Sequence, residues 1–148
     1  MGIHMQRLAV TQAVLLSALL GSLNLAVLLD RPLARAAQPS DAALKEQADA
    51  LMKNAEEMVA HGGMGDAKAI VHHCGEASRH AEALLAQIPP SDPRRSQASV
   101  SLNEVILQCK RVSEIGPHAD PGLLLNPAIK ARSAARESVK SLGLNPKS

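Results

Sequence analysis

The 148-residue chain contains no Phe, Trp or Tyr, and this absence limits what its core can be. Apolar packing has to come from Leu, Val, Ile, Ala and Met, most of which suit helices better than strands. We therefore predict a compact all-α domain, and a chain of this length is enough for one domain with a single core. The lack of aromatic platforms also argues against nucleic acid as a partner, because base stacking needs them.

Gly and Pro breaks divide residues 40–142 into four segments in which apolar residues recur at helical spacing. The fourth segment is expected to begin at about Pro127. Turns are expected at residues 62–65, 89–93 and 116–122. Because the connections are short, successive helices should be antiparallel neighbours. The sequence thus predicts an antiparallel up-down-up-down four-helix bundle in a domain spanning residues 37–148.

Residues 1–36 have the features of a signal peptide or membrane anchor. Arg7 precedes an apolar run of 22 residues, and Ala34 and Ala36 supply the small residues that a signal peptidase reads. The apolar run, residues 8–29, is also long enough to span a bilayer if it is retained as an anchor helix. In either case we expect the rest of the chain to be exported, to the periplasm or an equivalent compartment.

The two cysteines are expected to form a disulfide. Cys74 lies 17 residues before Ser91, near the centre of the second turn, and Cys109 lies 18 residues after it. In an antiparallel hairpin these positions have nearly the same height, and an exported protein with such a pair typically oxidises it. The alternative is that the two thiolates bind a soft metal ion.

Four of the six histidines fall between residues 61 and 80. His73 and His80 are two helical turns apart, and Glu76 lies between them on the same face. We predict that His73, Glu76 and His80 bind a divalent transition metal, with copper(II) favoured by the general affinity order. The alternative is that this stripe is a solvated polar helix face.

A second, weaker site is expected at the end of the first helix, where His61 could bind a metal together with Asp66 or Met64. Matching heights across the hairpin places His61 near residue 66, about seven residues from His73. The two sites should therefore be separate.

The stretch "NAEEMVAHGGMGDAKAIVHHCGEASRHAEA", residues 54–83, resembles the small metal-binding protein family of bacterial periplasms. The family pattern A-E-E-x-x-x-H-G, followed by two histidines seven residues apart, is met by residues 55–62, His73 and His80. The resemblance implies a short, aromatic-poor four-helix bundle that binds copper and other divalent ions. Asn54 and Asp66 stand where the family tends to have histidines, which implies fewer sites in this chain.

The exported part contains no Gly-rich phosphate loop, no HExxH and no CxxCH, so we expect no enzymatic activity and no organic cofactor. Two functional classes remain. The first is a periplasmic metal-binding protein that buffers or carries copper or another divalent ion through the first hairpin. The second is a non-catalytic helical accessory subunit or interaction module held at a membrane complex, with metal binding lost. The sequence does not identify a protein partner for the second.

Overall fold

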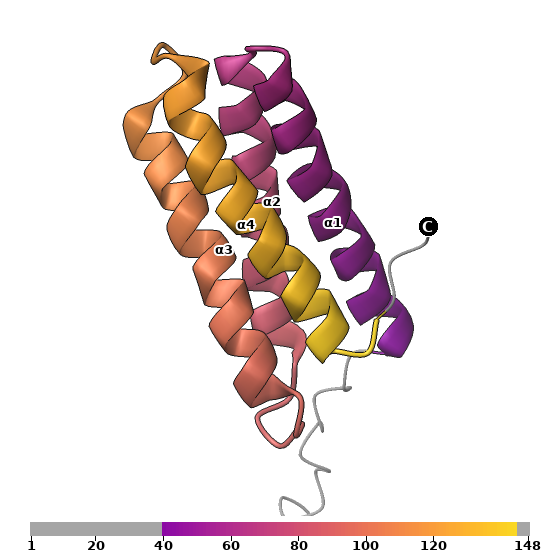
Figure 1. The fold of residues 1–148 in the computed structure, drawn as a ribbon. Coiled ribbons are helices and arrows are strands. Elements are labelled where there is room, and N and C mark those ends of the chain that lie inside the picture. The colour runs from indigo at the N-terminus through magenta and orange to yellow at the C-terminus, as the bar shows by residue number, and fades with distance from the viewer. Residues whose placement is uncertain (1–39, 145–148) are drawn as a thin grey trace, which may run out of the picture. The chain divides into compact units, whose positions relative to one another are not determined.

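The computed structural model describes residues 40–144, and all regular structure in this range is helical. The helices are α1 (Asp41–Gly63), α2 (Ala67–Gln87), α3 (Arg95–Ile115) and α4 (Pro121–Ser141). They lie side by side as a four-helix bundle, each running opposite to the one before it (Figure 1). The described residues contain no strand, so the all-α prediction is confirmed for them. The expected signal or anchor helix lies outside the described residues.

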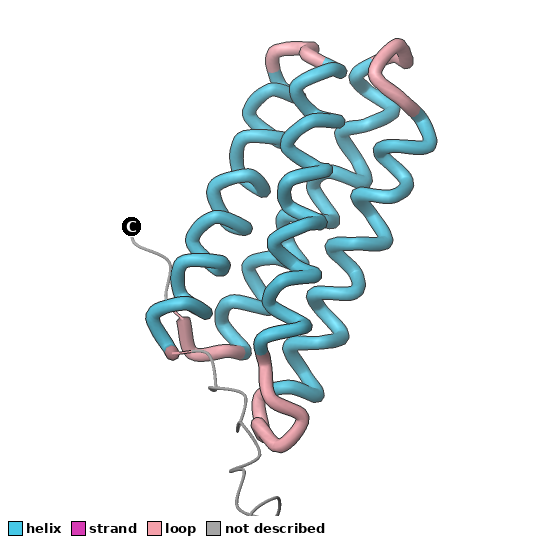
Figure 2. The backbone as a smooth tube through the Cα atoms, turned by 180° about the vertical axis from the view of Figure 1, so that it is seen from behind, coloured by secondary structure: helices cyan, strands magenta, loops and turns pink. Residues whose placement is uncertain are grey.

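The turns lie at the two ends of the bundle, with the α1–α2 and α3–α4 turns at one end and the α2–α3 turn at the other (Figure 2). Side-chain hydrogen bonds cap the N-termini of three helices: Ser40 caps α1, Asp66 caps α2 and Asp120 caps α4. None of the described helices combines the length and apolarity that crossing a membrane requires.

Helix α4 begins six residues earlier than the sequence suggested. Asp120 accepts a hydrogen bond from Gly122 N at 2.9 Å, and Pro121 occupies the first turn, where its missing N–H costs nothing. Pro127 therefore lies inside the helix. Its ring nitrogen cannot donate to the carbonyl four residues earlier. The helix nevertheless begins at the Asp120 cap and continues past Pro127.

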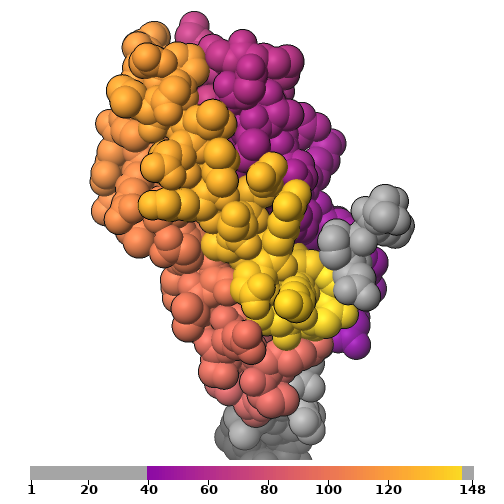
Figure 3. Space-filling model, in the orientation of Figure 1, coloured from indigo at the N-terminus to yellow at the C-terminus, as the bar shows by residue number. Residues whose placement is uncertain are grey.

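The core is built from aliphatic side chains of all four helices, and many of them are alanines. The small side chains let the helices approach closely. The largest fully buried side chains include Leu51, Met58, Ile70, Leu84, Leu102 and Leu124. In the space-filling view, α4 lies against α3 on one side and α1 on the other (Figure 3). On the α1–α4 side, Glu56 pairs with Arg132 at 3.5 Å and Arg136 at 2.6 Å.

Cys74 on α2 and Cys109 on α3 are both buried and form a disulfide. Their Cα atoms are 5.1 Å apart, within the range of about 4.4 to 6.8 Å that a disulfide requires. The predicted proximity is confirmed, and the bridge ties the first hairpin to the second. Because both sulfur atoms are in the disulfide, neither is a thiolate ligand in this structure.

Reducing the disulfide should lower the stability of the bundle. The bridge joins residues 35 positions apart, and closing a loop of that length contributes about 4 kcal/mol in the chain-entropy model. We expect a phosphine reductant to lower the free energy of unfolding by about 2–5 kcal/mol in urea titrations. The Cys74→Ala/Cys109→Ala variant is the control and should not respond to the reductant. An unchanged midpoint for the reduced wild-type protein would contradict the prediction.

Candidate metal centre

Three polar residues of α1, seven positions apart, each lie next to a polar residue of α2 or its N-cap. The partners are also seven positions apart. The pairs are Gln47 with His80, Asn54 with His73, and His61 with Asp66. Their polar atoms are 2.8, 3.0 and 3.9 Å apart, respectively. We call these six residues the α1–α2 seam. Five of the six immediately precede a buried residue, so the seam runs along the edge of the core.

Asn54 fixes the orientation and the tautomer of His73. The Asn54 Nδ2 group donates to the Ala50 carbonyl at 3.0 Å, so its Oδ1 atom is the one that faces His73. An amide oxygen only accepts hydrogen bonds, and therefore the Nδ1 atom of His73 carries the proton. In the neutral ring the lone pair is then on Nε2, which is left to bind another group.

His73 and His61 stack on each other beside Glu57. The ring centroids are 5.2 Å apart with an interplanar angle of 17°. The Nε2 atom of His61 is 3.9 Å from Glu57 Oε2, and its Nδ1 atom is 3.9 Å from Asp66 Oδ2. Ligand atoms of Glu57, His61 and His73 all lie within 4.8 Å of one another, and these three half-buried residues are the one such group in the described part of the chain. We call it the Glu57–His61–His73 cluster.

The expected separation of His61 from His73 is therefore wrong. Height matching follows Cα positions, but side chains on a helix lean toward its N-terminus. Since α1 and α2 are antiparallel, His61 leans along α1 toward residue 54 while His73 leans along α2 toward residue 66. The two rings meet between those heights.

Glu76 and His80 do not form a group with His73 as predicted, because they contact Arg79 whereas His73 contacts Asn54. The Arg79 Nη2 atom is 2.6 Å from Glu76 Oε2 and 3.1 Å from His80 Nε2. On its other side, His80 donates from Nδ1 to Gln47 Oε1 at 2.8 Å. Both ring nitrogens of this buried histidine thus have partners. The overlooked signal was Arg79 itself, three residues after Glu76 and adjacent to His80.

Burial favours the neutral form of two of the α2 imidazoles, His73 and His80. Desolvation, followed by the nearby rings of His72 and His61, lowers the pKa of His73 below its ordinary value of 6.5. Desolvation and the charge of Arg79 lower the pKa of His80 in the same way. A hydrogen bond from Arg79 lowers the pKa of Glu76. Neutral imidazole is the form that binds metal ions, so His73 is ready to do so at neutral pH.

Met64 and Asp66, the other ligands predicted near the first turn, do not belong to the Glu57–His61–His73 cluster. Met64 lies in the turn and is 70% exposed. Asp66 accepts from the Ala69 amide as the N-cap of α2, and its Oδ2 atom lies 3.9 Å from His61 Nδ1, beyond hydrogen-bond distance. The buried Met58 belongs to the core.

Glu57 is the site residue that sequence reasoning missed. It lies four residues before His61, which places both side chains on one face of α1. The neighbouring Glu56 points to α4, where it pairs with Arg132 and Arg136. The i, i+4 spacing of Glu57 and His61 was the available signal.

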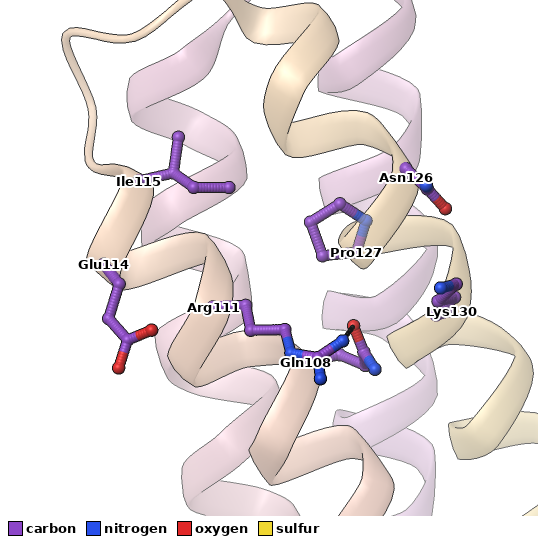
Figure 4. Close-up of a pocket in the computed structure, with 7 residues that line it drawn as sticks. All are labelled: Gln108, Arg111, Glu114, Ile115, Asn126, Pro127 and Lys130. Carbon is purple, nitrogen blue, oxygen red and sulfur yellow. Dashed lines mark hydrogen bonds between the residues drawn. The ribbon is translucent and has the colours of Figure 1, made fainter.

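A shallow hollow of about 380 Å³ lies between α3 and α4 on the second hairpin (Figure 4). Arg111 crosses it and donates to the Oε1 atom of Gln108 at 3.4 Å. The lining residues include no histidine or cysteine. This hollow therefore offers no imidazole or thiolate ligand, whereas the α1–α2 seam contains three histidines.

Comparison of the chain with protein-family models, with curated proteins and with solved structures finds no match. Function is therefore inferred from the chemistry of the α1–α2 seam.

The tautomers of His73 and His80 are testable in the metal-free protein. Both should carry the proton on Nδ1, because an amide oxygen of α1 accepts from that atom. Long-range ¹H–¹⁵N NMR spectra at pH 7.5 report the protonated nitrogen of each ring. The exposed His118 serves as a reference without these contacts. Protonation of His73 on Nε2 in the wild-type protein would contradict the geometry. The Asn54→Leu variant is the control: it should allow His73 to take the other tautomer and leave the tautomer of His80 unchanged.

Proposed function

We propose that the protein binds a divalent transition metal ion, copper(II) above others, at the Glu57–His61–His73 cluster. The observation that carries the proposal is that three ligand groups from two adjacent helices lie within 4.8 Å of one another. The resemblance of residues 54–83 to small metal-binding proteins supports the same function. In this role the protein buffers or carries metal in an exported compartment.

The donor set favours borderline metal ions. Two imidazole nitrogens and one carboxylate oxygen suit copper(II), nickel(II) and zinc(II), and copper(II) ranks highest in the affinity order. Calcium and magnesium prefer shells made largely or entirely of oxygen ligands. Copper(I) prefers thiolate and thioether ligands, but the cysteines form a disulfide and Met58 is buried in the core.

The surroundings of the cluster favour reversible binding. Asn54 holds His73 with Nε2 free, and Asp66 lies near the opposite nitrogen of His61 from Glu57. A contact such as that with Asn54 orients an imidazole ligand and raises its affinity for metal. Three protein ligands leave coordination positions open for water or for a ligand from another protein, and an open position allows exchange.

Alanine substitutions distinguish metal binding at this cluster from metal binding at the His73–Glu76–His80 stripe predicted from the sequence. His61→Ala and His73→Ala should each lower copper(II) affinity at least tenfold at pH 7.5, because each removes one of two imidazole ligands. His80→Ala should leave it within about twofold, since His80 binds Gln47 and Arg79. Calorimetry in a non-coordinating buffer measures the affinities, and circular dichroism verifies that the variants fold.

Protons should compete with the metal for the same nitrogens. Binding should weaken as the pH falls and the imidazoles gain protons, and because burial lowers the pKa of His73 below the ordinary 6.5, the loss through His73 begins below that pH. A loss of affinity in His80→Ala but not in His61→Ala would favour the His73–Glu76–His80 stripe. If all three variants bind like the wild type, the cluster does not bind metal and the accessory-subunit function takes its place.

We also propose that the bundle is exported. The Cys74–Cys109 disulfide supports this location, because structural disulfides persist in oxidising compartments. Intact-mass measurement of protein from its native host, with free thiols alkylated, should show no alkylation. It should also show either loss of a segment ending near Ala36 or a full-length chain in the membrane fraction. A full-length, doubly alkylated chain in the cytosol would contradict the proposal.

A further inference from the structure

A single nitrogen atom of Arg79 lies where a metal ion could bridge Glu76 and His80. Arg79 Nη2 contacts Glu76 Oε2 at 2.6 Å and His80 Nε2 at 3.1 Å. Both contacted atoms are metal-ligand atoms with a lone pair directed at the same cationic group. The guanidinium therefore takes the place that a divalent ion would take between a carboxylate and an imidazole.

We propose that Glu76 and His80 form a second metal site, distinct from the Glu57–His61–His73 cluster, which Arg79 keeps closed. Arg79 is permanently charged and cannot lose its proton at working pH, so it competes with metal ions under all such conditions. The site opens only when this side chain moves away. The proposal does not depend on metal binding at the first cluster.

The ligand atoms of the second site are already oriented. Gln47 Oε1 accepts from Nδ1–H of His80, which places the lone pair on Nε2 as Asn54 does for His73. Among the residues that the structure describes, Arg79 is the one hydrogen-bond and ion-pair partner of the Glu76 carboxylate, which is therefore free once Arg79 leaves. What distinguishes the two histidines is therefore their neighbours: Arg79 contacts Nε2 of His80, whereas His61 and Glu57 lie beside His73.

Arg79 contributes little to the stability of the fold. Its side chain is 60% exposed and that of Glu76 is 38% exposed. Ion pairs at such exposure contribute little to stability, since water and salt screen them. Removing the guanidinium should therefore leave the fold intact while exposing one carboxylate oxygen and one imidazole nitrogen to incoming metal.

The test uses full-length protein in which His61→Ala and His73→Ala have removed the first cluster. In this background Arg79→Ala should raise copper(II) affinity at least tenfold by calorimetry at pH 7.5. Adding Glu76→Ala should cancel the gain, because it removes the carboxylate ligand. In the wild-type background, Arg79→Ala should add one copper ion per chain.

Lys68→Ala is the matched control, because it removes one positive charge from an exposed position of the same helix. It should produce less than a twofold gain. Equal gains from Lys68→Ala and Arg79→Ala would reduce the effect to general electrostatics and overturn the proposal. An unchanged affinity in Arg79→Ala, or a gain that persists without Glu76, would also overturn it. The first cluster is absent from this background, so these outcomes are independent of whether it binds metal.

Discussion

The antiparallel pairing of α1 and α2 along the α1–α2 seam is the constraint on which the rest of the site depends. A seven-residue spacing on both helices returns each polar residue to the same edge of the core after two turns. His73 and His80 of α2 therefore each meet an amide of α1 through Nδ1. This contact sets the tautomer, and with it the nitrogen that is available to other groups.

The identity of the neighbouring residue then decides what each histidine can do. His73 lies beside His61 and Glu57, whereas the Nε2 atom of His80 accepts from Arg79. Two histidines with the same tautomer thus have different chemistry. The packing that permits this is aliphatic and alanine-rich, and the disulfide between α2 and α3 fixes the helix that carries both histidines.

Much of the fold could be predicted from the sequence because its signals are local or periodic. Gly and Pro breaks locate the turns, and the equal distances of Cys74 and Cys109 from the second turn predict their contact. The start of α4 differs from the prediction because Asp120 and Pro121 begin the helix, whereas the same residues are equally typical of a turn. Of the site, His73 could be identified as a candidate ligand from its spacing, and the proximity of His61 to Asp66 could be predicted from matched heights across the hairpin. The convergence of His61 with His73 depends on the direction in which side chains lean, and the position of Arg79 depends on its rotamer.

The central claim is that His61 and His73 share one ion. Substoichiometric copper(II) added to isotopically labelled protein broadens the NMR signals of the rings that bind it. The account predicts that the His61 and His73 ring signals disappear together and first, while those of His80 and His118 persist. Loss of the His80 signals before those of His61, or equal broadening of all histidines, would contradict it.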